Sequence, residues 1–565
     1  MDALYKETVL LVEEYPLLKQ YGIYGAIAGS LILYTASLAI YRLYFHPLAG
    51  FPGPKIAAVS RWYEFYHDVV KRGNYVYKIE EMHQKYGKVP FLLRGYIPLY
   101  FSLAFPHTTV TEDKLTRPII RINPHEIVIN DPEFYNDVYV TGNTRRTAIW
   151  PRYRTGIGFD GSHTMTENHE LHRRRRKPLE PFFSRMGIDK MEPMIIEEAK
   201  LLNARLTGLK GSGNVVRLDH VFSAFAGDVI GRICCESPPD MLNNPEFGKE
   251  WHNLIEGIVR QLLLFMHFPQ LVALASMIPT GFLLRVYPGA AGFNVFRQLA
   301  TKHIIDAKED NLSKQKVEAN AKSSIFRYVI TSEMPKSECD TERLSREAMV
   351  LFGAGTATTA RTMGFMCYYI LTNPHMRQRL GEELNDIMAD YPHTLPTWQQ
   401  LEQLPYLQAL IKEGLRTLEV ITEKANVCSL SYGVMRRLPR ISPDIPLVYK
   451  QWVIPAGTPV GMAAYSLHTD PKVYPEPFKF IPERWLDDYD TDMNRNWVPF
   501  SRGSRNCLGM NLAYAEMYWA MAVMFRPNAP RFELFETDES DISQAVDFLM
   551  PLPKLDSNGT RITIH

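Results

Sequence analysis

The sequence predicts a mainly α-helical domain with a minor β-sheet, preceded by one N-terminal transmembrane helix. Apolar residues recur at spacings of three and four, the period of a helix with one buried face, in three segments: 323–332, 341–371 and 374–388. Asn373 and Pro374 suit the cap and the first turn of the last of these. Runs of β-type residues between Pro and Gly are short and lie near 119–122, 447–453 and 458–460.

The transmembrane helix is predicted from a run without charged residues at positions 21–41. About 20 such residues span a bilayer as a helix. Arg42, Lys55 and Arg61 follow the run, and the positive-inside tendency places them in the cytosol. We therefore expect a lumenal N-terminus at 1–20, an anchor at 21–44, a proline-rich hinge at 45–55 and the catalytic domain at 56–565. The alternatives are a cleavable signal peptide and a buried core helix.

Composition excludes several classes of protein. The chain has 565 residues, 46% of them hydrophobic and 22% charged, so it is neither disordered nor fibrous. A formal net charge of +1 gives no reason to expect nucleic acid as a partner. The six cysteines form no CxxC pair and no regular spacing, which argues against a zinc site or a disulfide framework.

One cysteine stands apart in its surroundings. Cys507 is framed by Gly503 and Gly509, has Arg505 nearby and is followed by a helix-like stretch at 510–523. Glycine permits a tight loop and close approach of the backbone to a bulky group. A thiolate just before a helix N-terminus, near an arginine, is favoured electrostatically. These features indicate a sulfur that binds a metal; the alternative is an ordinary buried thiol.

The segment 500–509 fits the pattern F-x-x-G-x-R-x-C-x-G and resembles the haem-binding loop of the cytochrome P450 family. The resemblance implies the cytochrome P450 fold from about Pro52 to the C-terminus, and haem b as cofactor. It also implies that Cys507 is the axial iron ligand and that Phe500, Gly503 and Arg505 contact the cofactor. A thiolate on haem iron favours cleavage of the O–O bond.

A second set of charged residues agrees with this resemblance. Glu413 and Arg416 lie three apart, on one face of a helix, and Pro482-Glu483-Arg484-Trp485 follows before the cysteine loop. The order is similar to the family's E-x-x-R and P-E-R-F elements, with Trp485 in place of phenylalanine. It implies a structural cluster of Glu413, Arg416 and Arg484; the alternative is a solvated surface pair.

The most basic stretch, 172–177, precedes Phe182 and Phe183. It is similar to a helix of fungal members of the family whose first and last basic positions reach the haem propionates. The resemblance implies this contact for His172 and Arg176, four residues apart on one face, and Arg440 is a candidate for the other propionate. The alternative is a solvated face.

Residues 354–359, Ala-Gly-Thr-Ala-Thr-Thr, lie inside a long apolar helix and resemble the family's oxygen-binding groove, A-G-x-[D/E]-T-T. Thr358 then occupies the catalytic, oxygen-activating position. Ala357 stands where the family has an acid that relays protons. Either water or substrate hydroxyls replace this carboxylate, or the enzyme hydroxylates slowly and leaks peroxide. We expect the first, because the other motifs are intact.

Two stretches, 88–117 and 417–429, have no counterpart in the pattern of fungal relatives. We expect that one or both are retained introns; a loop that faces the membrane or a partner is the alternative.

The resemblance is greatest to fungal enzymes of specialised metabolism of the trichodiene oxygenase type. It implies a monooxygenase that oxidises a lipophilic, terpenoid-like intermediate with O2 and electrons from NADPH-cytochrome P450 reductase. The location implied is the endoplasmic reticulum membrane, with a single span and a cytosolic catalytic domain. Two alternatives remain: a haem-thiolate isomerase or dehydratase that needs no electrons, and an inactive haem-binding protein.

Overall fold

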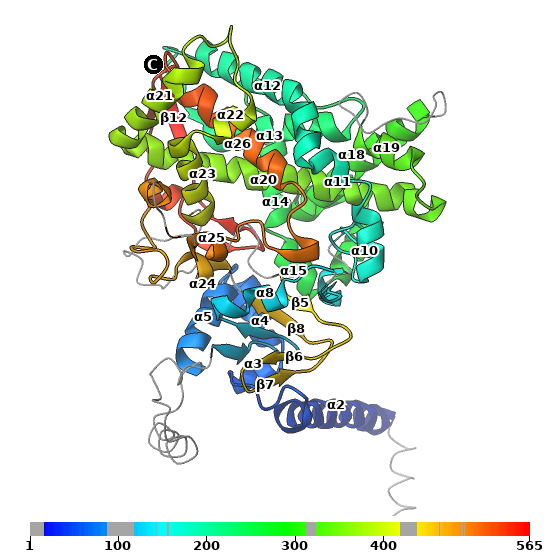
Figure 1. Cartoon of the computed structure of the whole chain (residues 1–565). Coiled ribbons are helices and arrows are strands. Elements are labelled where there is room, and N and C mark those ends of the chain that lie inside the picture. The colour runs from blue at the N-terminus through cyan, green and yellow to red at the C-terminus, as the bar shows by residue number, and fades with distance from the viewer. Residues whose placement is uncertain are drawn as a thin grey trace, which may run out of the picture. The chain divides into compact units, whose positions relative to one another are not determined.

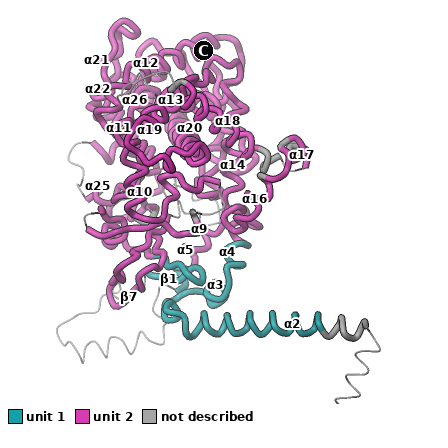
Figure 2. The backbone as a smooth tube through the Cα atoms, turned by 90° about the vertical axis from the view of Figure 1, so that its right-hand side faces the viewer, with its two compact units in different colours: residues 1–65, 82–128 teal, residues 66–81, 129–565 magenta. Residues whose placement is uncertain are grey.

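The computed structural model describes residues 16–86, 118–142, 144–154, 158–286, 288–311, 324–417, 438–462, 464–486, 490 and 492–565. The chain divides into two compact units, residues 1–65 with 82–128 and residues 66–81 with 129–565 (Figure 2). Of the two stretches suspected of being introns, 88–117 and 418–429 lie outside the described residues. Thr417 is the last residue of helix α23 (Pro405–Thr417).

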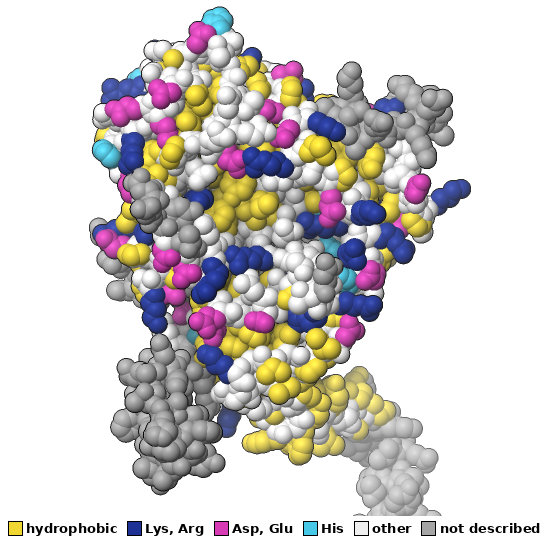
Figure 3. Space-filling view, in the orientation of Figure 1, with side chains coloured by type: hydrophobic (Ala, Val, Ile, Leu, Met, Phe, Trp, Pro, Cys, Tyr) yellow, Lys and Arg dark blue, Asp and Glu magenta, His cyan; other side chains and the backbone are white. Residues whose placement is uncertain are grey.

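The first unit contains the predicted membrane anchor. Helix α2 (Pro16–Ile40) continues into the π-helical turn η1 (Tyr41–Phe45), and residues Ile23–Phe45 are long and apolar enough to cross a bilayer. The large apolar side chains of this segment are exposed (Figure 3): Ile23, Tyr24, Ile27, Leu31, Ile32, Leu33, Tyr34 and Ile40. Exposed apolar side chains along a whole helix are unfavourable in water and suit lipid. This confirms one N-terminal apolar helix that could span a membrane.

The hinge residues of the same unit pack on a short strand. Helices α3 (Lys55–Val59) and α4 (Trp62–Phe65) follow the anchor, and β1 (Ile119–Arg121) lies beside the proline-rich segment. The Arg121 backbone N–H donates to the Pro52 carbonyl over 2.7 Å. A Cβ on Gly53 would lie 2.3 Å from the Arg121 carbonyl oxygen, so only glycine permits this approach. Helix α5 (Tyr75–Tyr86) and strand β2 (Ile127–Ile129) have residues in both units.

The second unit is mostly helical and is built around α20 (Thr341–Thr372), which packs against α13 (Leu218–Cys234), α18 (Pro288–Asn311) and α26 (Met510–Phe525) (Figure 1). The remaining longer helices are α10 (His169–Arg176), α12 (Arg185–Gly208), α14 (Lys249–Val259), α16 (Gln270–Met277) and α21 (Pro374–Met388). Almost every residue of α13 and of the second half of α26 is buried. These helices therefore form the core.

The strands of this unit are short and antiparallel. Strand β5 (Arg440–Ile441) lies between β3 (Ala148–Ile149) and β8 (Pro459–Met462), with Arg440 opposite Ile149 and Val460. Three further groups pair in the same way: β4 (Val216–Arg217) with β12 (Arg561–Ile564) and β9 (Phe532–Leu534); β6 (Leu447–Tyr449) with β7 (Trp452–Ile454); and β10 (Val546–Asp547) with β11 (Pro551–Leu552).

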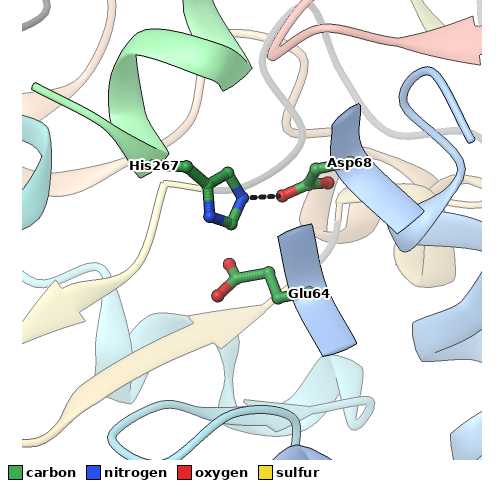
Figure 4. Close-up of side chains that lie close together, drawn as sticks. All are labelled: Glu64, Asp68 and His267. Carbon is green, nitrogen blue, oxygen red and sulfur yellow. Dashed lines mark hydrogen bonds and ion pairs between the residues drawn. The ribbon is translucent and has the colours of Figure 1, made fainter. Parts of the chain in front are cut away.

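A buried ion pair joins two short helical segments of this unit. The Nε2 atom of His267, at the end of α15 (Leu262–His267), lies 3.2 Å from the Asp68 carboxylate of η2 (Tyr66–Val70), and both side chains are 5% exposed (Figure 4). A hydrogen bond between buried side chains is stronger than the same bond in water.

The predicted elements are largely present. The expected helix 374–388 is α21, and the Asn373 side chain accepts hydrogen bonds from the N–H groups of His375 and Met376 as a cap. The expected helix 323–332 is shorter, Ile325–Thr331 (α19). The expected strand 447–453 is a hairpin, because Lys450 turns the chain at a φ of 51°. The fold class, mainly α with small sheets after one apolar helix, is confirmed.

Candidate functional site

Cys507 lies in a loop between η7 (Gly503–Arg505) and α26. Its backbone N–H donates to the Phe500 carbonyl over 2.9 Å, which closes the loop. The Phe500 ring packs against Tyr514 of α26, 5.3 Å between ring centres. The thiol is exposed, yet protein atoms surround it densely. A side chain with both properties faces an internal space.

The electrostatics of this thiol differ from expectation in one respect. Burial raises its pKa, while the Gly509 N–H and the positive charge of Arg176 act in the opposite direction. Arg505, which the sequence placed beside the sulfur, instead donates to the backbone carbonyls of Thr147, Thr166 and Glu167. A thiol that binds a metal ion is deprotonated by the metal itself.

The two glycines of the loop serve different purposes. Gly503 has a φ of +77°, and a Cβ there would lie 2.3 Å from the Val140 carbonyl oxygen, so this glycine lets two backbone segments meet. At Gly509, a Cβ would meet nothing within 4 Å. Open space therefore adjoins the loop at Gly509, two residues after Cys507.

Positive side chains gather beside the loop, and one of them, Arg176, is paired with the exposed carboxylate of Glu180 at 3.2 Å. Burial, and then the charges of Arg440 and Arg176, lower the pKa of Arg505 to about 9. Arg176 donates to the Asn506 carbonyl over 2.7 Å and to the Asn506 side chain over 2.9 Å. Arg440 donates to the Arg505 carbonyl over 3.3 Å. Three guanidinium groups this close together favour an anionic ligand.

His172 belongs to the same cluster. Its Nδ1 lies 2.8 Å from the His163 carbonyl oxygen and its Nε2 lies 3.3 Å from that of Ser504. A neutral imidazole can donate to only one of these acceptors. Burial and the charge of Arg505 nevertheless lower the pKa of His172 to about 3. A nearby anion would relieve this conflict by favouring the imidazolium.

These features fit haem b, which is flat, apolar and carries two propionates. Cys507 would supply the thiolate, the open space at Gly509 would admit part of the ring, and the cations would suit the two carboxylates. His172, Arg176, Arg440 and Arg505 all converge on this one region, as the sequence predicted; which of them touch a propionate stays a prediction.

Helix α20 carries the predicted oxygen-binding residues. The Thr358 hydroxyl donates to the Ala354 carbonyl over 2.9 Å, and Ala354 is exposed in the middle of an otherwise packed helix. Gly355 has a packing reason: a Cβ there would lie 2.9 Å from Ile230 of α13. The glycine thus allows close contact between two core helices.

Glu413, Arg416 and Arg484 meet in the protein interior. The Glu413 carboxylate accepts five hydrogen bonds, two from Arg416 and one each from Arg484, the Ile481 N–H and the Trp485 indole. Glu413 and Arg416 are fully buried. Arg416 also donates to the carbonyls of His468, Pro477 and Lys479. The surface-pair alternative is wrong, because no member of this cluster is exposed.

Sequence reasoning missed two contributors. Trp485 was noted only as a replacement for phenylalanine, yet its indole N–H gives Glu413 a hydrogen bond of 2.8 Å that phenylalanine lacks. Glu516 of α26 is buried against α20 and hydrogen-bonded to Thr359, and burial raises its pKa well above the usual range. Neither contact has a signal in local spacing, because each joins segments far apart in the chain.

The family model for cytochrome P450 matches residues 118–556. The chain is 73% identical over 527 residues to the cytochrome P450 monooxygenase tndB of Aspergillus flavipes, covering 90% of this chain and 100% of that protein. It is 51% identical to stellatic acid synthase of Emericella variicolor, covering 96% and 95%. It is 44% identical to fusicoccadiene C-8 hydroxylase of Phomopsis amygdali, covering 93% of each. The chain therefore belongs to the cytochrome P450 family, as a haem b-dependent monooxygenase related to fungal enzymes of secondary metabolism.

Proposed function

We propose that this enzyme hydroxylates a lipophilic terpenoid intermediate, using O2 and electrons from NADPH-cytochrome P450 reductase. The observation that carries the proposal is the Cys507 thiol, which faces an internal space beside a cluster of cations. One of the relatives bears the name fusicoccadiene C-8 hydroxylase, which denotes oxidation of a hydrocarbon. A related chain of the same length is expected to act on a similar class of molecule.

Haem b, when bound, supplies the activation of O2; the side chains hold it, direct protons and exclude water. Cys507 would hold the haem iron through its sulfur. Arg505, Arg440, Arg176 and His172 would neutralise the propionates and thereby fix the orientation of the ring. Phe500 packs against Tyr514 and steadies the loop that carries the cysteine. Gly503 is required because the loop must pass close to the Val140 carbonyl.

Thr358 holds and delivers protons at its hydroxyl. The hydroxyl donates to the Ala354 carbonyl at rest, and it can rotate to offer its proton to a group on the exposed side of α20. The helix at this point carries no acid, since Ala357 occupies the neighbouring position. The proton must therefore come from another element.

A membrane location agrees with two separate apolar surfaces. In the first unit, Ile23–Phe45 is a candidate span. In the second unit, helices α16 and α17 (Thr280–Val286) expose large apolar side chains: Leu271, Leu274, Met277, Phe282 and Val286. Monomeric proteins rarely leave such groups together in water, so these helices suit contact with lipid. We place the enzyme in the endoplasmic reticulum membrane with its catalytic domain in the cytosol.

The surface near the Cys507 loop suits an acidic redox partner. Arg173, Arg174 and Lys177 are exposed at the end of α10, whose Arg176 binds the loop at Asn506. A patch of one charge attracts a partner of the opposite charge and raises the rate of encounter. The reductase is expected to dock on this side.

The proposal is tested by producing the full chain together with its reductase and supplying terpene hydrocarbons as substrates. We expect a product that is one oxygen atom heavier and appears only when NADPH and reductase are present. Conversion without either would favour the isomerase or dehydratase. A ferrous–carbonyl spectrum without the strongly red-shifted thiolate band would favour an inactive haem-binding protein.

A further inference from the structure

A cavity with several polar side chains in its wall lies beside the position where the acid is missing. It has a volume of about 70 Å³, and Thr356, Ala357 and Ala360 of α20 form one wall. Ser223 of α13 and His252 and Glu256 of α14 line it as well. Liquid water occupies about 30 Å³ per molecule, so the cavity has room for about two waters with several polar partners.

Three of these side chains form a hydrogen-bonded chain. The Ser223 hydroxyl lies 2.8 Å from His252 Nδ1, and His252 Nε2 lies 3.3 Å from the Glu256 carboxylate. Arg260 contacts the other oxygen of the same carboxylate at 2.5 Å. Both nitrogens of the imidazole are therefore engaged, one by a hydroxyl and one by an acid. In this arrangement an imidazole can take up and release a proton.

The chain runs from the surface to the interior. The side chains of Arg260, Glu256 and His252 are 36%, 23% and 17% exposed. Ser223 and Thr356, at the other end, are 3% and 1% exposed. Proton exchange with solvent is thus possible at Glu256, and the inner end meets the middle of α20.

The cavity also borders the position of the missing acid. Ala357 lies on its wall, and a methyl group there leaves space that a carboxylate would fill. Thr358 is not part of this wall; it is the next residue of α20, about 100° around the helix from Ala357. Water in the cavity can therefore lie where a carboxylate at position 357 would lie.

We propose that Ser223, His252 and Glu256, with water in this cavity, form the proton relay that replaces the carboxylate absent at Ala357. This inference rests on the proposed monooxygenase function. Each transfer conserves protons: His252, with a proton on both nitrogens, gives the one on Nδ1 to Ser223, the hydroxyl gives its own proton to water, and the water protonates Thr358 as that hydroxyl delivers its proton. His252 keeps the Nε2 proton on the Glu256 carboxylate and regains a proton at Nδ1 from solvent.

The charge of Glu256 supports this direction of transfer. Burial opposes its ionisation, but the hydrogen bond from His252 and the charge of Arg260 outweigh burial and lower its pKa to about 2. The carboxylate is then ionised at neutral pH and attracts protons from solvent toward the imidazole. The wall carries two other ion pairs, Arg217 with Asp219 and Lys554 with Asp541. Neither contains a histidine, whose imidazole gains and loses a proton near neutral pH.

The first test measures product and peroxide formed per NADPH in the reductase-coupled holoenzyme. His252→Phe and Glu256→Gln should lower the product per NADPH by about a hundredfold, the lower end of what a positioned proton donor contributes, and raise peroxide accordingly. Glu250→Gln is the matched control, because Glu250 is exposed on the same helix outside the cavity. Adding Ala357→Glu to His252→Phe should restore the ratio, and a purely structural role of His252 predicts no such rescue.

The second test does not involve activity. A crystal structure of the resting holoenzyme should show ordered waters in the cavity, within hydrogen-bonding distance of the Ser223 hydroxyl. A dry cavity, or an unchanged product ratio in both relay variants, would overturn the proposal. The thiolate band of the ferrous–carbonyl spectrum separates this outcome from failure of the proposed function. The band persists in all variants if only the relay is wrong, and it is missing from the parent enzyme if the function is wrong.

Discussion

Replacing Trp485 with phenylalanine tests what holds the buried charge cluster together. The substitution removes the indole N–H that donates to Glu413 over 2.8 Å, and Arg416 is then the remaining side-chain donor to that carboxylate oxygen. A hydrogen bond to a charged group contributes about 1.5–3 kcal/mol. Trp497→Phe is the matched control, because the Trp497 indole donates over 3.3 Å to the uncharged carbonyl of Lys412. That bond is expected to contribute about 0.5–1.5 kcal/mol.

A protein that loses a cofactor when it unfolds is not two-state, so the assay is kinetic. The thiolate band of the ferrous–carbonyl complex is followed at a fixed concentration of urea. If the contact is lost before the transition state for unfolding, Trp485→Phe should accelerate loss of the band by about tenfold to a hundredfold. Trp497→Phe should accelerate it by roughly tenfold at most. Equal rates for the two variants would refute the role assigned to Trp485.

Three further predictions concern the haem side of the protein. Thr358→Val should lower product per NADPH by about tenfold or more and leave the carbonyl spectrum unchanged, since only a proton-delivering hydroxyl is lost; an unchanged ratio would contradict this. Arg505→Gln should speed transfer of haem to a competing apoprotein by about tenfold, because charge-assisted hydrogen bonds are lost; equal transfer would argue against propionate binding. Burial, then Arg416 and Arg502, lower the pKa of His468 to about 3, and its Nε2 accepts from the Val498 N–H as a neutral ring. The contribution of neutral His468 to the free energy of unfolding is complete above about pH 6.5. Below that pH it falls by about 1.4 kcal/mol per pH unit, because the unfolded chain binds the proton and the folded chain does not. His468→Gln should therefore flatten the loss of stability between pH 6 and 4.

Local patterns were sufficient for much of the fold. The cap at Asn373 and the helix that begins at Pro374 follow from residues adjacent in the sequence, and the structure has both at the predicted positions. The hairpin at 447–454 was read as one strand, because the turn depends on a positive φ at Lys450, a residue without a strong turn preference. Such a turn is set by the pairing of the strands on either side.

The site could be predicted from the residues alone where one segment carries the pattern, and across segments only through the resemblance to the family. The loop around Cys507 is such a segment, and so is the pair Glu413 and Arg416. The local pattern around Cys507 does not contain the arginine whose charge acts on its sulfur. That arginine is Arg176 of α10, which binds Asn506, 330 residues later in the chain. The relay of His252 and Glu256 has only the ordinary i, i+4 spacing of a surface pair, and its connection to Ala357 exists only in the packed structure.

The most direct test of the bond between this sulfur and iron is the ferrous–carbonyl difference spectrum. It is recorded for the full chain and for Cys507→Ser, together with the product yield of each. The parent chain should give the strongly red-shifted band of a thiolate ligand and, with reductase and NADPH, an oxygenated product. The serine variant should lose the band and the product together. Undiminished conversion by the variant would show that Cys507 is not the ligand on which oxidation depends.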